Sequence, residues 1–430
     1  MSAEVVGLII LFATLAILML IRIPIAFSLG IASLMTALFL DINLFLLFQK
    51  MVISLYNFGF LAVPFFILAA SIMTEGGISD KLMKFADVLI GRIRGGTAMA
   101  NIVVSMFFGG ISGSSVADVS SIGALLIPAM EKEGYDKDYS VAVTVTSSVQ
   151  GIIIPPSQNM IYYAIAAGGL SISKLFIAGY IPGLLLGLAL MTVAYAVAKK
   201  RNYPIGKKYS FKEGLKISFD SLLGLTTIFI IIGGIVGGIF TPTESAGIAA
   251  IYGLIITSFV YKTMTIKRFK KVLKGSLNSL ATIMAVISMS SMFGYILAYL
   301  KVPTMISEFM LSLTDNPILI MLMINIVLLV AGMFMDMAVL IFMLTPIFLP
   351  VATTIGYDPI HFGIIMILNL GIGLCTPPVG NSLFVGCAIA KLPIEKSFKA
   401  FMPFYSAIAL LLILLIIFPQ ISLWLPSVIG

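Results

Sequence analysis

The sequence predicts an all-α polytopic membrane protein, and three observations support that fold class. Of the 430 residues, 60% are hydrophobic and only 10% are charged, whereas about 25% of the residues of a soluble domain are charged. Apolar runs of about 20 residues, the length that crosses the hydrocarbon layer of a bilayer, recur along the chain. The segments between these runs are too short for a separate soluble domain. We therefore expect the whole chain to lie in the membrane.

The apolar runs also define the expected elements. Simple spans are predicted near residues 5–21, 23–40, 51–74, 139–168, 174–198, 218–240, 243–261, 277–299, 360–389 and 398–418. The first of these lacks a cationic start and a small-residue cleavage site, so we interpret it as a retained span and not a signal peptide. Regions 95–130 and 317–354 are too long for one crossing and are interrupted in the middle, which predicts two re-entrant helical hairpins.

Charge fixes an expected orientation. If the basic stretches 199–216 and 262–274 are cytoplasmic, all of the 26 Lys and Arg residues except Lys50, Lys174 and Lys301 fall on that side, as the bias towards cytoplasmic basic residues requires. Both termini are then periplasmic. We interpret the basic stretches 81–94 and 262–274 as amphipathic segments on the cytoplasmic surface that brace the protein.

The same features exclude several functions. The net charge of +8 is explained by the short basic loops, so no nucleic acid partner is expected. Cys375 and Cys387 lack CxxC spacing, and the single histidine, His361, is placed at the outer end of a span without a specific role, so disulfide and zinc chemistry are not expected. The sequence has no HExxH motif, no GxSxG motif and no Walker phosphate loop. We therefore expect neither an enzyme nor an ATP-driven pump.

An internal repeat divides the chain into residues 1–216 and 217–430. Gly134-Tyr-Asp recurs as Gly356-Tyr-Asp, and Pro155-Pro156 recurs with the same displacement as Pro377-Pro378. The first span of each half runs in the opposite direction, which predicts the inverted repeat that secondary transporters build around a midplane site. The alternative is an old duplication with a purely structural meaning.

The interruptions predict where ions and solute bind. Each Pro-Pro pair ends a half-helix within spans 139–168 and 360–389, which leaves carbonyls near Gly151, Ile154, Gly373 and Thr376 without partners. Together with the hydroxyls of Ser112, Ser114 and Thr376, these oxygens suit a dehydrated Na⁺. The half-helices that resume at Ser157 and Val379 suit a carboxylate, and Asn159 and Asn381 either donate to it or cap the resumed helix. Asp118 and Asp336 are the deepest acids, either functional or capping the hairpin tips.

These segments give the chain a family resemblance. Gly109-Gly-Ile-Ser-Gly-Ser-Ser-Val-Ala-Asp-Val-Ser-Ser-Ile-Gly123, Leu126-Ile-Pro-Ala-Met130, the two Pro-Pro breaks and Thr241-Pro-Thr-Glu-Ser-Ala246 together resemble the large membrane subunit (DctM-like or SiaM-like) of tripartite ATP-independent periplasmic (TRAP) transporters, in the ion transporter superfamily. The resemblance covers nearly the full chain. It implies a bacterial inner-membrane protein that takes up an organic acid, such as sialic acid or a C4-dicarboxylate, by Na⁺ symport.

The resemblance also implies partners and residue roles. A periplasmic substrate-binding protein (DctP-like or SiaP-like) would deliver the acid, and a small four-helix membrane subunit (DctQ-like or SiaQ-like) is expected as a separate chain because no extra helices precede Val5. Both hairpins and both broken spans would move as a block against a scaffold, in an elevator mechanism. One Na⁺ site would use Ser112, Gly151, Ile154 and Pro155, and the other Gly332, Gly373, Thr376 and Val379. Ser114, Ser115 and Asp336 would face the solute.

Two other transport functions remain alternatives. A self-sufficient Na⁺/carboxylate symporter of the same superfamily would need no binding protein, so transport by this chain alone would favour it. A passive channel would not explain paired broken helices in an inverted repeat, and uptake without Na⁺ dependence would favour it.

Overall fold

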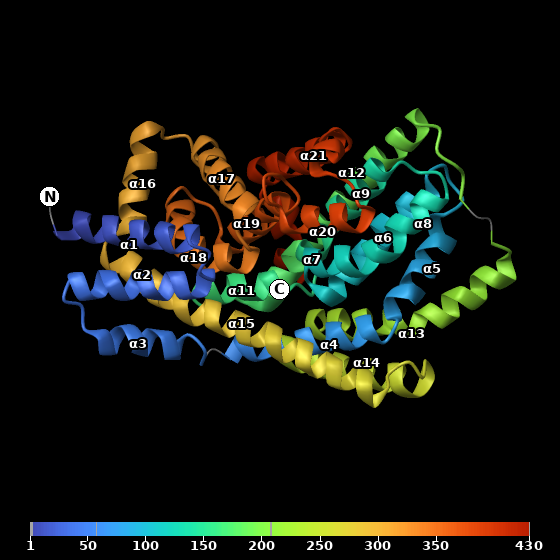
Figure 1. Cartoon of the computed structure of the whole chain (residues 1–430), viewed down its shortest axis with the longest axis horizontal. Helices are drawn as coiled ribbons and strands as arrows, with labels where there is room; N and C mark the ends of the chain where they lie inside the picture. The colour runs from blue at the N-terminus through green and yellow to red at the C-terminus, as the bar shows by residue number, and fades with distance from the viewer. Residues whose placement is uncertain (1–2, 57, 207–208, 430) are drawn as a thin grey trace.

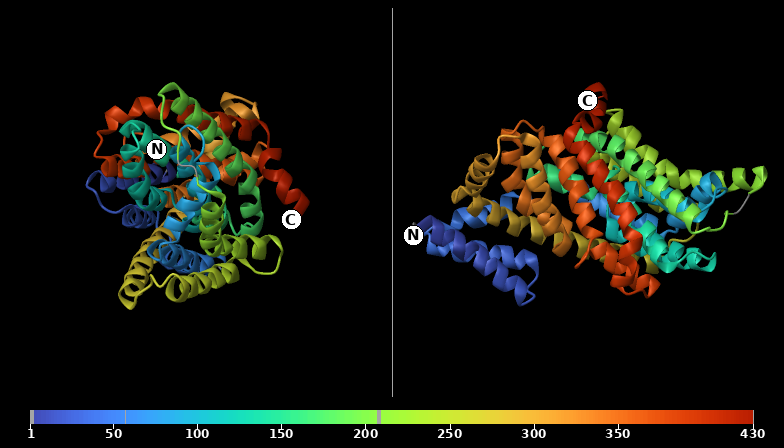
Figure 2. Two further views of the ribbon diagram at one scale, coloured as in Figure 1. Left: turned by 90° about the vertical axis from the view of Figure 1, so that its right-hand side faces the viewer. Right: turned by 90° about the horizontal axis from the view of Figure 1, so that it is seen from above.

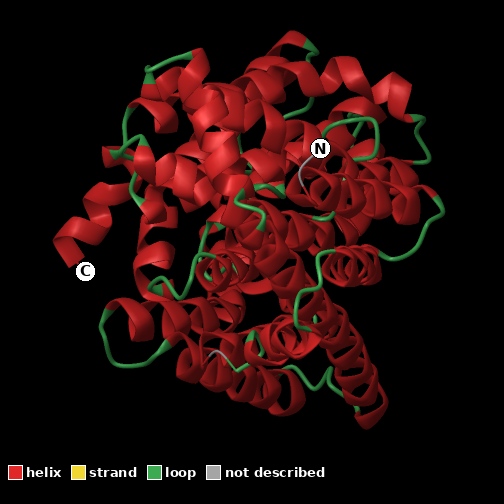
Figure 3. Cartoon of the chain, turned by 90° about the vertical axis from the view of Figure 1, so that its left-hand side faces the viewer, coloured by secondary structure: helices red, strands yellow, loops and turns green. Residues whose placement is uncertain are grey.

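The all-α prediction is confirmed. The computed structural model describes residues 3–56, 58–206 and 209–429, and within these ranges it consists of helices and loops without a β-strand (Figure 3). Eight helices of the described chain are long and apolar enough to cross a membrane. The molecule is elongated, with the N-terminal helices at one end of its long axis (Figure 2).

The helices of the first half follow the predicted order, with short pieces around the interruptions. They are α1 (Ala3–Leu20), α2 (Ile25–Phe39), α3 (Leu44–Ile53), α4 (Ala62–Glu75), α5 (Ile78–Ile90), α6 (Gly96–Ser112), α7 (Ser115–Asp118), α8 (Ala124–Lys132), α9 (Lys137–Ser147), α10 (Gln150–Ile153), α11 (Gln158–Ala166) and α12 (Ile172–Lys200). A 3₁₀ turn, η1 (Phe58–Leu61), precedes α4, and a π-helical segment, η2 (Val119–Gly123), joins α7 to α8.

The helices of the second half are longer on average and include two that the apolar runs did not predict. They are α13 (Phe211–Val236), α14 (Pro242–Ile255), α15 (Ile266–Tyr299), α16 (Val302–Leu313), α17 (Pro317–Phe334), α18 (Met337–Thr354), α19 (Pro359–Leu374), α20 (Asn381–Ala390), α21 (Ile394–Ile417) and α22 (Gln420–Ile429). A π-helical segment, η3 (Ile256–Val260), follows α14.

The helices form two sets that meet along α15. Figure 1 shows α15 running obliquely below the helices of residues 96–166 and 317–390, next to α3, α4 and α14. This long helix packs against α2, α3 and α4 of the first half and against α18 of the second. The interrupted segments are therefore held together above one continuous helix.

Several boundaries differ from the prediction for identifiable reasons. The expected span 51–74 is wrong, because α3 ends at Ile53 and a 3₁₀ turn leads into α4. Stretch 262–274 is not a separate surface segment, since no strong helix breaker follows Thr265 and α15 continues unbroken to Tyr299. The boundary at 216/217 falls inside α13, which starts earlier because Ser210 and Glu213 form a capping box.

Segment 81–94 does leave the direction of the preceding span. Residues 59–75 and α5 are bent by 70° at Gly76 and Gly77, and the left-handed φ of 78° at Gly77 is a conformation that glycine adopts without strain. The helix α5 has an apolar face that contacts α6 and α13. This geometry fits the amphipathic bracing segment that the basic pattern predicts.

His361 lies in the first turn of α19, at the end of a span as expected, and it makes contacts that the sequence did not predict. Its side chain is fully buried, and Nδ1 lies 2.6 Å from the hydroxyl of Ser422 in α22. The ring also stacks on Tyr357, with 5.7 Å between ring centroids. Because α22 is too short to be recognised as a span, its packing on α19 and its contact with this histidine could not be predicted from the apolar runs.

The landmarks of the internal repeat have matching local conformations. Gly134 and Gly356 both end a helix with a left-handed φ, 93° and 90° respectively. In both halves a helix–break–helix hairpin precedes a helix that is itself broken at a Pro-Pro pair, and both Pro-Pro peptide bonds are cis.

A cluster of ions and tyrosines connects the start of α9 to the end of α12. Arg201 Nη1 donates to Asp136 at 2.9 Å and to Asp138 at 2.8 Å, and the Tyr203 hydroxyl donates to Asp136 at 2.6 Å. The Tyr203 ring packs beside Tyr139, with centroids 4.9 Å apart. The hydrogen bond from Tyr203 and then the Arg201 guanidinium hold the pKa of Asp136, which lies in a loop, below its usual range.

The variant Tyr203→Phe tests this cluster, because it keeps the ring and removes the hydroxyl. We expect a loss of about 1 kcal/mol of stability at neutral pH. A carboxyl whose folded-state pKa is lowered stabilises the protein above its unfolded pKa of about 3.9, and that contribution disappears as the pH falls through the folded value. The difference in thermal unfolding between variant and wild type should therefore shrink below about pH 4. Tyr299→Phe at a half-exposed tyrosine is the control, and an equal effect of both variants would contradict the assignment.

Candidate functional site

The first broken span is interrupted where the sequence predicted. The helix ends at Ile153, Ile154 is extended with φ −81° and ψ 124°, and α11 resumes at Gln158. The hydroxyl of buried Ser157 donates to the carbonyl of Ile152 at 2.6 Å. Ser157 therefore satisfies one of the carbonyls that Pro155 and Pro156 leave without a backbone donor.

At the second break, a hydroxyl and a backbone amide form the hydrogen bonds. Here α19 ends at Leu374 and α20 begins at Asn381. The Thr376 hydroxyl donates to the carbonyl of Ile372 at 2.7 Å, and the amide of Gly380 donates to the carbonyl of Met333 at 3.1 Å. The second contact ties this break to the tip of the second hairpin.

Both hairpins reverse at capped helix ends. In the first, Gly113 has a left-handed φ of 60° and the Ser114 hydroxyl accepts from the amide of Ala117 at 3.4 Å. In the second, Asp336 Oδ1 accepts from the amide of Ala338 at 3.0 Å. The capping interpretation of Asp336 is thus confirmed, although its side chain also remains exposed.

Glycine pairs bring each hairpin against its broken span. A Cβ atom on Gly109 would lie 2.1 Å from the Cα of Gly151, and a Cβ atom on Gly332 would lie 3.2 Å from the Cα of Gly373. The backbones therefore touch without intervening side chains, just before each break. Of the residues predicted to bind Na⁺, Gly151 lies at the first contact, and Gly332 and Gly373 form the second. A Cβ atom on Gly110 would also lie 3.0 Å from the carbonyl oxygen of Pro155. Ser112 is the last residue of α6, and Ile154, Thr376 and Val379 lie in the breaks themselves.

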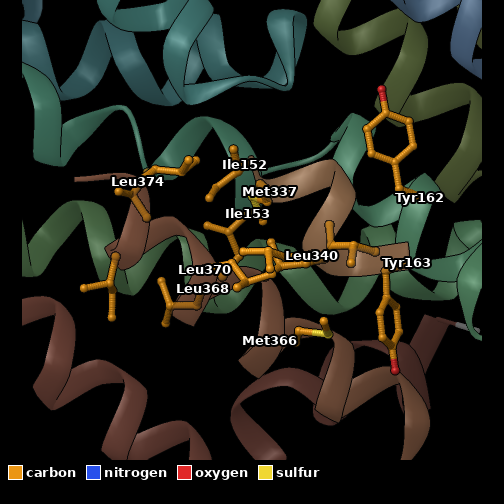
Figure 4. Close-up of a cluster of buried hydrophobic side chains, with 14 of the residues drawn as sticks. Ile152, Ile153, Tyr162, Tyr163, Met337, Leu340, Met366, Leu368, Leu370 and Leu374 are labelled. Carbon is orange, nitrogen blue, oxygen red and sulfur yellow. The ribbon is translucent and has the colours of Figure 1, made fainter. Parts of the chain in front are cut away.

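A line of serines connects the two halves. The buried Ser115 hydroxyl lies 2.5 Å from the Ser148 hydroxyl and 2.7 Å from the Ser382 hydroxyl. Ser115 belongs to the first hairpin tip, Ser148 to the first broken span and Ser382 to the second. Figure 4 shows buried apolar side chains of both halves in one core cluster, among them Ile152, Met337 and Leu374.

A cavity of about 340 Å³ lies between the hairpin tips, the first break and α15. Its wall contains four of the six residues that the sequence predicted to bind the solute: Ser114, Ser115, Asn159 and Asp336. Ser157 and Asn381 do not line it. The cavity is also lined by Gly113, Val116, Ile152, Gln158, Tyr162, Ser279, Thr282, Ile283, Met337, Ala338 and Leu374.

The structure decides between the alternatives for Asn159 and Asp118. Asn159 does not cap α11, because its side-chain amide donates to the carbonyl of Gly113 in the first hairpin tip at 3.1 Å. Asp118 is 1% exposed and does not line this cavity. Its carboxylate oxygens have no hydrogen-bond partner in the described part of the chain. Of the two deep acids, only Asp336 is available to a solute.

The sequence reasoning missed part of the wall. Gln158 donates to the carbonyl of Ser112 at 3.1 Å, which holds the first tip against α11. Ser279 and Thr282 of α15 also line the cavity. Their spacing of three places them on one face of the helix, so two hydroxyls at that spacing in an apolar run were the available signal.

The eight long apolar helices and the interrupted helices around a polar cavity define a polytopic membrane protein. The family model described as "Tripartite ATP-independent periplasmic transporter, DctM component" matches residues 12–421. The chain belongs to this family, the large permease subunits of TRAP transporters.

Individual relatives agree. The chain is 41% identical to the C4-dicarboxylate TRAP transporter large permease protein DctM of Pseudomonas aeruginosa, over 87% of each chain. It is 38% identical to the sialic acid TRAP transporter large permease protein SiaM of Vibrio cholerae, over 88% of each chain. In fold it is similar to the YdaH transporter of Alcanivorax borkumensis, with a TM-score of 0.62 and 12% identity over 87% of this chain and 88% of that one.

The glycine contact predicts the effect of adding a side chain. Gly109→Val would place carbon atoms inside the backbone of residue 151, so we expect a loss of about 1–3 kcal/mol or a failure to fold. Gly233→Ala is the matched control, because a Cβ atom there meets nothing within 4 Å. Thermal unfolding in detergent measures both, and a Gly109→Val protein as stable as the control would contradict the close packing.

Proposed function

We propose that this chain is the large membrane subunit of a Na⁺-coupled TRAP transporter that takes up an organic acid. One observation carries the proposal: a polar cavity lies where both hairpin tips meet the first break, next to α15. Irregular backbone at membrane depth is tolerated where it lines a cavity or binding site. Paired breaks of this kind are typical of secondary transporters.

The wall of the cavity suggests how the solute is oriented. The hydroxyls of Ser114 and Ser115 and the amides of Gln158 and Asn159 come from the first hairpin tip and the first break, whereas the Asp336 carboxylate comes from the second hairpin tip. A carboxylate of the solute is repelled by Asp336 and is accepted by the hydroxyl and amide donors. Asp336 in turn accepts from hydroxyl or N–H groups of the solute. This polarity fits a carboxylate that carries donors elsewhere, as sialic acid does.

Sodium is the coupling ion that the donor sets favour. Each hairpin–break contact offers backbone carbonyls and one side-chain hydroxyl, Ser112 in the first and Thr376 in the second. Among the described residues no three His, Cys, Asp or Glu side chains cluster as metal ligands. Neutral oxygens suit a monovalent hard cation better than a transition metal.

The relatives' names and the arrangement of helices suggest the rest of the system. A large permease implies a small membrane subunit, and a TRAP transporter implies a periplasmic binding protein that delivers the acid. The hairpins with the broken spans form the moving block of an elevator, and α15 with α2, α3 and α4 forms part of the scaffold. The protein lies in the bacterial inner membrane with both termini in the periplasm.

Uptake into proteoliposomes that contain the chain, its small subunit and the cognate binding protein tests this function. Labelled sialic acid and succinate are the first solutes, with and without a Na⁺ gradient. Asp336→Asn and Ser115→Ala should reduce uptake at least about 100-fold, because each leaves a polar group of the bound solute unpaired. Thermal unfolding controls for folding, and Ser427→Ala at a distant exposed serine should transport normally. Full uptake by both site variants would contradict the solute assignment, and uptake without the binding protein would favour the self-sufficient symporter.

The Na⁺ sites are tested separately. Thr376→Val keeps the shape and removes the hydroxyl, so we expect the Na⁺ concentration at half-maximal uptake to rise about 10-fold, equivalent to about 1.4 kcal/mol. Ser112→Ala should do the same at the first site. Thr192→Val, on a surface hydroxyl bonded within α12, is the control. Unchanged Na⁺ dependence in both site variants would remove these residues from the ion sites.

A further inference from the structure

A second cavity continues from the solute cavity towards the basic start of α15. It has a volume of about 380 Å³ and shares Ser114, Gln158 and Ser279 with the first. Its remaining wall comes from α4, α6, α7, η2 and α15. Because three residues belong to both walls, the two cavities adjoin.

One cation faces this passage. Lys271 is the single basic residue in the walls of the two cavities, whereas the other lysines and arginines near the start of α15 do not line them. Lys271, Gly275 and Ser279 are spaced by four residues, so they lie on one face of the helix. With a rise of 1.5 Å per residue, Lys271 lies about 12 Å along the axis from Ser279.

Lys271 forms an ion pair with Glu75 that is exposed and therefore weak. Lys271 Nζ lies 2.6 Å from Glu75 Oε1, at the end of α4. The lysine side chain is 72% exposed and that of Glu75 is 31% exposed. Exposed ion pairs of this kind contribute about 0–1 kcal/mol, so a carboxylate that arrives in the passage can replace Glu75 as the partner of Lys271.

Charge is therefore distributed unequally along the passage. The solute cavity contains neutral donors and the Asp336 carboxylate but no positive side chain. A bound acid is thus not held by a full opposite charge, and the first cation on its way out is Lys271. A flexible four-carbon stem lets the ammonium reach into the passage.

We propose that Lys271 is an anion relay in the exit passage: it accepts the solute carboxylate as it leaves the central cavity, and Glu75 is its counter-ion when the passage is empty. This inference rests on the proposed function, because it assumes an anionic solute. It adds a charge-specific step at an ion pair between α4 and α15, whose two residues belong neither to the hairpins nor to the predicted Na⁺ sites. The passage opens beside segment 262–274, which the charge pattern predicts to be cytoplasmic.

A chemical probe tests the electrostatic part without transport. Ser279→Cys is made with Cys375 and Cys387, both buried, replaced by serine, and its modification is timed with an anionic and a cationic methanethiosulfonate reagent. Lys271→Gln should lower the ratio of anionic to cationic rates about 3- to 10-fold, and Glu75→Gln should raise it. Lys270→Gln, one position away and outside both walls, should leave the ratio unchanged. An unchanged ratio in Lys271→Gln would overturn the proposal.

Transport then tests the relay itself. In proteoliposomes with the complete system, Lys271→Gln should reduce the maximal uptake of sialic acid or succinate about 3- to 10-fold with little change in its Na⁺ dependence, and Lys271→Arg should restore it. If wild-type protein transports neither solute, the proposed function fails, whereas the cysteine rates still test the charge of the passage. If wild type transports and Lys271→Gln is as fast, the relay fails and the proposed function stands.

Discussion

Every backbone amide and carbonyl in an apolar environment needs a partner, and this constraint determines how the centre of the molecule is built. The two Pro-Pro pairs remove backbone donors in the middle of long apolar helices. Carbonyls freed in this way accept hydrogen bonds from nearby side chains, from the Ser157 hydroxyl at the first break and from the Thr376 hydroxyl at the second. A backbone amide at the second break finds its partner in another element, because the amide of Gly380 donates to the carbonyl of Met333. The breaks are stable because the hairpins lie against them, so hairpin and break form one unit.

Close approach and polar contact are combined in that unit. Glycine at 109 and 151, and again at 332 and 373, removes the side chains that would keep hairpin and broken helix apart. With the backbones in contact, short side chains such as Ser115 reach Ser148 and Ser382 directly. The two halves are therefore joined at their centre by hydroxyls and not by charges. Hydroxyls can exchange partners with a solute or an ion at low cost, whereas a buried ion pair costs several kcal/mol to separate.

The sequence specified the centre of this protein better than its periphery. Pro-Pro pairs, glycine clusters and polar residues inside apolar runs have one physical explanation each, so both breaks, both hairpins and four wall residues of the cavity were found. The periphery depends on weaker signals. Nothing in an apolar run of ordinary length marks where α3 ends or that α22 folds back to partner His361. Likewise, the wall formed by Ser279 and Thr282 depends on how α15 crosses the hairpins, which is a tertiary property and leaves only a faint periodic pattern.

The distribution of charge follows from the same constraint as the breaks. An unpaired charge is expensive where water is scarce, so the solute cavity is lined by neutral donors, and its single acid, Asp336, is placed at a helix N-terminus where the amide of Ala338 partly compensates it. Full charges of both signs appear only where the passage meets solvent, at Glu75 and Lys271. Under the proposed function, a charged solute is held by hydrogen bonds in the interior and meets an opposite charge only at Lys271. The same proposal explains how binding in the centre remains weak enough for release, because no full positive charge lines the central cavity.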